Sequence, residues 1–128
     1  MDGKGAISTQ SGLLKDAQYS FKTRFEDGVG TNPEELVAAA HAGCFSMALS
    51  VILGEAGMKP EKIETSATVT LIKDGAGFSI TESHLEVKAK VPGADAAAFQ
   101  KAAEAAEGGC PISKLFKAKI TMNAQLEN

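Results

Sequence analysis

The sequence predicts an α+β fold for this chain of 128 residues. Three features predict it: a long apolar helix without charges, two long segments of alternating apolar and polar residues, and an alanine-rich helix near the end. They follow the order strands, central helix, strands, second helix, last strand. No linker, repeat or low-complexity tract divides the chain, so we expect a single domain over residues 1–128.

The central helix is predicted within the segment from Thr31 to Gly57. Asn32 suits the N-cap position, Pro33 suits the first helical position, and Glu35 completes the spacing of a capping box. From Leu36 to Leu53 there is no Asp, Glu, Lys or Arg, and apolar side chains occur all round the helical circumference. We therefore expect a helix that starts at Pro33 and is buried on every side.

The apolar stretch of this helix reaches the lower length limit of a membrane span. His41, Ser46 and Ser50, together with the many small residues and the amphipathic remainder of the chain, argue against a span. A chain of this length has few elements with which to surround such a helix. A second copy is the most economical cover, so a homodimer is predicted.

Strands are predicted on both sides of the central helix. Short strands joined by turns occupy residues 1–25, and the last of them, Tyr19 to Phe25, places Arg24 near its end. After the helix, Ile63 to Ile72 alternates well, and an Asp-Gly turn leads into Phe78 to Val91, which predicts a hairpin. The apolar phase of the second strand changes midway, so we expect a bulge near residues 82–84.

The C-terminal part predicts a second helix, a short turn and a last strand. Asp95 caps the alanine-rich helix from Ala96 to Glu107, which has Phe99 as its one large anchor. Cys110 and Pro111 open a short helical turn, and the inward-facing residues of the last strand are Ala118, Ile120, Met122, Ala124 and Leu126. Because the side chains on the face of the alanine-rich helix are small, we expect it to pack closely on another helix.

Composition excludes some classes of function. A hydrophobic content of 44% with 23% charged residues is ordinary for a soluble globular protein. The chain has 13 basic and 16 acidic residues and no cluster of Lys or Arg, so its charge does not indicate nucleic-acid binding. Residues 1–20 lack the apolar core of a secretory signal. Two cysteines in such a chain favour reduced thiols in the cytoplasm, and a structural disulfide is the weaker interpretation.

Cys44 and Cys110 are the two sulfur nucleophiles of the chain. A cysteine within a helix of Ala, Phe and Met residues is usually a small buried hydrophobe. Cys110 precedes Pro111 at a helix start, where free N–H groups favour the thiolate, although a capping role without chemistry explains it equally well. Spacing alone does not decide between these interpretations.

His41 lies three residues before Cys44 and is compatible with a base, a metal ligand or a core histidine with satisfied hydrogen bonds. A zinc site of His41, Cys44 and Cys110 would need a fourth ligand, which no paired-cysteine spacing suggests. Glu34, in the first helical turn, is favourable there through the helix dipole alone.

Three segments of the chain resemble the OsmC branch of the OsmC/Ohr family of osmotically inducible and organic hydroperoxide resistance proteins. They are GTNPEELVAAAHAGCFSMALSVILGEAG, GGCPISKLF and YSFKTRFEDG. The resemblance covers nearly the whole chain. It implies an intertwined α+β dimer, in which antiparallel sheets from two chains wrap the central helices, and thiol-dependent reduction of organic hydroperoxides without a metal or cofactor. It assigns Cys44 as the peroxidatic cysteine, Cys110 as the resolving cysteine, Arg24 as the active-site arginine and Glu34 as its carboxylate partner.

The residue types suit that chemistry. A thiolate cleaves the peroxide O–O bond, so a buried Cys44 requires a fixed cation nearby, which Arg24 supplies and Glu34 orients through a bidentate contact. Attack leaves a sulfenic acid on Cys44, and Cys110 condenses with it to a disulfide. An external dithiol, of lipoyl type in the Ohr branch, then reopens that bond.

Helix geometry sharpens the assignment. Glu34 and Cys44 are ten residues apart, which corresponds to about 15 Å along a straight helix. We therefore expect Glu34 to reach the site of the partner subunit. The apolar surroundings of Cys44 favour alkyl or lipid hydroperoxides. Two alternatives remain open from the sequence: a thiol-based peroxide sensor without efficient turnover, and a metal-binding stress protein that uses His41 and both cysteines.

Overall fold

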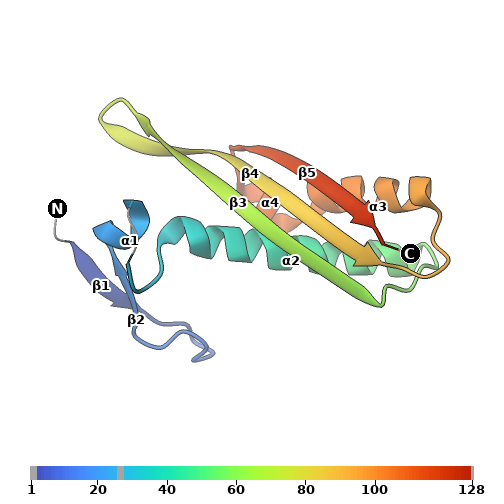
Figure 1. Ribbon diagram of the computed structural model, residues 1–128, viewed down its shortest axis with the longest axis horizontal. Coiled ribbons are helices and arrows are strands. Elements are labelled where there is room, and N and C mark those ends of the chain that lie inside the picture. Colours follow the sequence, from blue (N-terminus) through green and yellow to red (C-terminus); the bar gives the residue numbers. More distant parts are fainter. Residues whose placement is uncertain (1–2, 26–27, 128) are drawn as a thin grey trace. The chain divides into compact units, whose positions relative to one another are not determined.

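The computed structural model describes residues 3–25 and 28–127. They form two compact units, Met1–Val37 and Ala38–Asn128, which are described separately. The elements in chain order are β1 (Lys4–Ile7), β2 (Ala17–Ser20), α1 (Phe21–Phe25), α2 (Pro33–Glu55), β3 (Lys62–Asp74), β4 (Gly77–Lys90), α3 (Ala96–Gly109), α4 (Pro111–Leu115) and β5 (Lys119–Leu126) (Figure 1). This mixture of helices and sheets confirms the predicted α+β class.

In the first unit, β1 and β2 pair as an antiparallel hairpin and α1 follows directly. The N–H of Thr23 donates to Ser20 Oγ at 3.1 Å, and the N–H of Ser20 donates to Thr23 Oγ1 at 2.9 Å. This reciprocal cap starts a helix. The predicted strand from Tyr19 to Phe25 is therefore wrong beyond Ser20, and Arg24 lies on α1.

The start of α2 agrees with the prediction. The N–H of Glu35 donates to Asn32 Oδ1 at 2.7 Å, as expected of an N-cap, and Pro33 is the first helical residue. The Asn32 amide also donates to the backbone oxygen of Thr23 at 2.9 Å. This bond ties the first turn of α2 to α1, the helix that carries Arg24.

The second unit contains a three-stranded sheet in the order β3-β4-β5. β3 and β4 form the predicted hairpin, and its register shifts between Thr70 and Leu71, opposite Thr81 and one residue before the predicted bulge. β4 and β5 are parallel, so the expectation of antiparallel sheets is wrong for the last strand. The cause is the crossover through α3 and α4, which returns the chain to the end of the sheet where β4 began.

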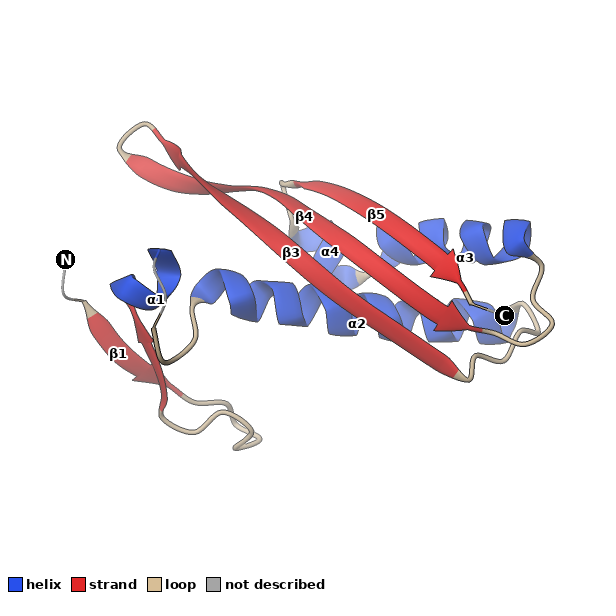
Figure 2. Cartoon of the chain, viewed as in Figure 1, coloured by secondary structure: helices blue, strands red, loops and turns tan. Residues whose placement is uncertain are grey.

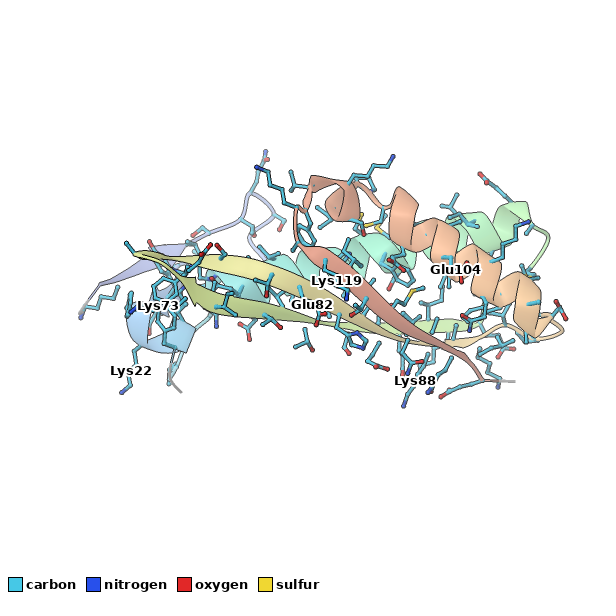
Figure 3. The ribbon with its side chains drawn as sticks, turned by 90° about the horizontal axis from the view of Figure 1, so that it is seen from above. Lys22, Lys73, Glu82, Lys88, Glu104 and Lys119 are labelled. Carbon is cyan, nitrogen blue, oxygen red and sulfur yellow. The ribbon has the colours of Figure 1, made fainter. Side chains whose placement is uncertain are left out.

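Both long helices of this unit cover one face of the sheet (Figure 2). Along β4, Leu85, Val87 and Ala89 are buried, whereas Lys88 points away from the helices (Figure 3). The core brings these strand residues against α2 and α3. Its helical members are Phe45, Leu49, Leu53, Phe99, Ala102, Ala103 and Ala106.

The central helix α2 is buried on one face only. Phe45 and Leu49 are fully buried, whereas Met47 is 73% exposed and Val51 is 59% exposed. The expectation of a helix buried on every side is therefore wrong for a single chain, because the sheet and α3 lie on one face of it. By length and composition α2 meets the criteria for a membrane span, which for a single helix is weak evidence, and its buried residues belong to the core.

Candidate active site

The second unit brings the two cysteines into contact. Cys44 lies in the middle of α2 and is half-buried, whereas Cys110 lies between α3 and α4 and is fully buried. Both are free thiols, and they lie close enough for each to shift the pKa of the other. Two residues that lie far apart in the sequence thus form one dithiol site.

Cys110 is the cysteine whose surroundings favour the thiolate. Burial raises its pKa, but hydrogen bonds from Cys44, from the N–H and hydroxyl of Ser113 and from the N–H of Ile112 oppose this effect, and the pKa lies below its usual value. The donors belong to the first turn of α4, directly after Pro111. Within one chain, the negative charge of the pair therefore rests preferentially on Cys110.

The pKa of Cys44 is raised. The causes are burial first, then the hydrogen bond to Cys110 and the charge of that residue, which the N–H of Ile112 offsets only in part. A nucleophilic role for Cys44 consequently needs an additional positive charge close to its sulfur.

Cys44 opens on an apolar groove with a volume of about 760 Å³. The groove runs along the exposed face of α2 and ends at α4, where Pro111 and Ile112 line it. Met47 and Val51 also line it, whereas Cys110 does not. A ligand in this groove therefore meets the sulfur of Cys44 before that of Cys110.

The first unit pairs Arg24 with Glu34. Arg24 Nε donates to Glu34 Oε1 at 2.8 Å, and Nη2 lies 2.7 Å from the same oxygen. Both donors converge on one oxygen, so the contact differs from the expected bidentate pairing with two oxygens. Glu34 is 8% exposed, and its Oε2 is buried without a hydrogen-bond partner among the described residues. The guanidinium also lies 5.5 Å from the ring centre of Phe25.

His41 is a fully buried histidine with both ring nitrogens satisfied. Nδ1 lies 2.7 Å from Ser83 Oγ, and Nε2 lies 2.8 Å from Ser113 Oγ. Phe116 packs edge-on against the ring at 4.9 Å between centroids. Of the three interpretations of His41, the structure shows the core histidine. Within residues 3–25 and 28–127, no group of three His, Cys, Asp or Glu side chains is placed to hold a metal ion.

Comparison with known proteins shows the family of the chain. A family model described as OsmC-like protein matches residues 25–125. The chain belongs to the OsmC family. It is 53% identical to peroxiredoxin OsmC of Escherichia coli over 98% of this chain and 88% of that protein. It is also 35% identical to organic hydroperoxide resistance protein OhrA of Bacillus subtilis, over 75% of this chain and 67% of the relative.

Solved structures share the fold of this OsmC-family chain. OhrB of Bacillus subtilis superposes with a TM-score of 0.69 at 24% identity, covering 99% of this chain and 98% of the other. An OsmC-like protein of Mycoplasma pneumoniae gives a TM-score of 0.73 at 13% identity, with coverage of 100% and 98%. At these identities the structural similarity supports the fold alone.

We expect His41 to make the stability of this OsmC-family protein depend on pH. Burial lowers the pKa of the folded-state imidazole, so the unfolded chain takes up the proton first as the pH falls below about 6.5. Above that pH the protein keeps the full stability contribution of the neutral His41. Below it, the free energy of unfolding decreases until the pH reaches the folded-state pKa. Urea titrations at pH 7.5 and 5.0 measure the loss.

The matched control uses the second histidine, His84, which bonds Thr121 and Glu86. His41→Leu should lose less free energy of unfolding than the wild type between the two pH values, whatever its absolute stability. His84→Leu measures how the loss changes when a histidine that is not fully buried is removed. An unchanged loss in His41→Leu contradicts the prediction.

Proposed function

We propose that this OsmC-family protein is a cysteine-based peroxidase that reduces organic hydroperoxides to alcohols in the defence against oxidative and osmotic stress. The observation that carries the proposal is a cysteine, Cys44, that lies on an apolar groove beside a second, buried cysteine, which shifts its pKa. The names of the relatives, a peroxiredoxin and an organic hydroperoxide resistance protein, support the same class of reaction.

In the proposed cycle, the thiolate of Cys44 attacks one peroxide oxygen and the O–O bond breaks. The alkoxide leaves and takes a proton to become an alcohol, while Cys44 becomes a sulfenic acid. The thiolate of Cys110 then attacks the sulfur of Cys44; the S–S bond forms, and the hydroxide leaves as water after gaining a proton. An external dithiol, of lipoyl type in this proposal, reduces the disulfide by exchange and is itself oxidised.

The active form in this proposal is a homodimer in which Arg24 and Glu34 of one subunit serve Cys44 of the other. Three observations support it. The pKa of Cys44 is raised within its own chain, α2 separates Glu34 from Cys44 by ten residues or about 15 Å of helical rise, and the apolar face of α2 is exposed. An arginine keeps its charge at every physiological pH, so it stabilises the thiolate without titrating.

The groove defines the proposed substrate class. Its lining is apolar along α2 and α4, so an alkyl or lipid hydroperoxide buries hydrocarbon surface there, whereas hydrogen peroxide has none to bury. We place the protein in the cytoplasm, where reducing conditions keep both thiols available.

Wild-type protein should reduce cumene hydroperoxide with a kcat/KM at least about tenfold above that for hydrogen peroxide, because burial of the apolar group contributes roughly 25 cal/mol per Å². Peroxide consumption with dithiothreitol or dihydrolipoamide as donor measures both rates. Many turnovers per subunit are expected. Oxidation that stops at one equivalent would instead identify a peroxide sensor, and equal rates for the two peroxides would contradict the role of the groove.

A further inference from the structure

A buried series of polar side chains leads from the sheet to Cys110, and the cycle above makes no use of its histidine and two serines. It runs from Ser83 on β4 through His41 on α2 to Ser113 on α4, and then to Cys110. His41, Ser83 and Cys110 are fully buried, and Ser113 is 6% exposed. All four residues belong to the second unit.

The number of hydrogens available determines the direction of the hydrogen bonds in this series of side chains. Ser113 has one hydroxyl hydrogen and two groups that compete for it: His41 Nε2, at 2.8 Å, and Cys110, whose pKa this hydroxyl lowers. It donates to Cys110 only if its oxygen accepts from His41, which requires a hydrogen on Nε2. A neutral imidazole with that hydrogen has a bare Nδ1, and Nδ1 accepts from the hydroxyl of Ser83 at 2.7 Å.

We propose that His41 is a positioning residue for the resolving step: its Nε2–H group holds Ser113 so that the Ser113 hydroxyl donates to the thiolate of Cys110. The inference rests on the proposed peroxidase function, because it assigns the resolving role to Cys110. In the opposite order, with the hydrogen on Nδ1, Ser113 donates to His41 and Cys110 loses this donor.

The proposed order requires a neutral imidazole, and the surroundings of His41 favour one. The groups that face the ring are the hydroxyls of Ser83 on β4 and Ser113 on α4, together with the ring of Phe116 after α4. None of these three carries a charge, and burial lowers the pKa of the imidazole. His41 therefore keeps its proton while the Cys110 thiolate displaces hydroxide from Cys44.

The first test measures the thiolate of Cys110 directly, by ultraviolet absorbance against pH in a Cys44→Ser background, where no peroxide is needed. Ser113→Ala and His41→Leu should each raise the pKa of Cys110 by about one unit, because Ser113→Ala removes the hydroxyl that lowers it and His41→Leu removes the N–H group that orients this hydroxyl towards the sulfur. His41→Gln should restore much of the effect, because its amide has one donor and one acceptor side. His84→Leu is the matched control and should change nothing.

The second test follows the two chemical steps with Cys44 present. His41→Leu should slow the conversion of the sulfenic acid to the disulfide by about tenfold near neutral pH, while the rate of Cys44 oxidation by cumene hydroperoxide stays unchanged. Equal slowing of both steps would indicate a merely structural role and overturn the inference. A normal Cys110 titration in all variants would do the same.

Nitrogen NMR of wild-type His41 keeps the inference falsifiable if the variants fail to fold. A neutral ring with its hydrogen on Nε2 is expected at neutral pH, and a ring with its hydrogen on Nδ1 would refute the proposal. Failure of the peroxidase function has a different signature: Cys44 would not form a sulfenic acid in the wild type, whereas the Cys110 titration would still respond to His41 and Ser113.

Discussion

Replacing Cys44 with serine should lower kcat/KM for cumene hydroperoxide by at least about a thousandfold, because the hydroxyl is a far weaker nucleophile than the thiolate at neutral pH. Cys44 is half-buried and lies on the groove, so the substitution removes one polarizable atom and leaves the core intact. Consumption of cumene hydroperoxide with dithiothreitol as donor measures the loss, and circular dichroism checks the fold.

Cys110→Ser is the companion variant, because it tests the division of labour. It should complete the first turnover at nearly the wild-type rate and then accumulate sulfinic acid on Cys44, which mass spectrometry detects. Within one chain the surroundings favour the thiolate on Cys110, so the opposite assignment has a clear signature. If Cys110→Ser abolishes the first turnover while Cys44→Ser retains it, the roles are reversed.

Arg24→Met should lower the rate of Cys44 oxidation by at least about a hundredfold, because the raised pKa of Cys44 then has no cation to counter it. Mixing provides the decisive measurement. A purified mixed dimer of one Arg24→Met subunit and one Cys44→Ser subunit should recover about half of the wild-type activity, because one of its two sites combines an intact Cys44 with the partner subunit's Arg24.

Two controls accompany this prediction. Lys22→Met removes an exposed positive charge from the same short helix α1 and should leave the rate unchanged (Figure 3). Arg24→Lys should recover only part of the loss, because an ammonium group keeps the charge without the planar fork that meets Glu34. A mixed dimer that stays as inactive as its two parents would show that Arg24 serves the cysteine of its own chain.

Local signals made much of the fold predictable from the sequence. Asn32 and Pro33 mark the start of α2, Asp95 caps α3 through a bond from the N–H of Ala98, and the Asp-Gly turn closes the hairpin of β3 and β4. The family resemblance also predicted Cys44, Cys110, Arg24 and Glu34 as the site residues. Each of these features depends on residues that are close together in the sequence or on a contiguous sequence motif.

The tertiary structure decided the rest. The alternating segment from Tyr19 to Phe25 looks like a strand, but the cap formed by Ser20 and Thr23 turns it into α1. The direction of β5 depends on the crossover before it. The surroundings of His41 depend on Ser83 and Ser113, which lie 42 and 72 residues further along the chain. No local pattern reports such contacts, because packing alone brings those side chains together.

The sequence by itself therefore determined which segments form the main elements, and it predicted which residues carry chemistry, because capping, periodicity and motifs are local properties. Only the tertiary structure decided how the charge is shared by the two thiols. The two pKa values differ because the first turn of α4 packs against the middle of α2. There Ile112 and Ser113 donate hydrogen bonds that lower the pKa of Cys110.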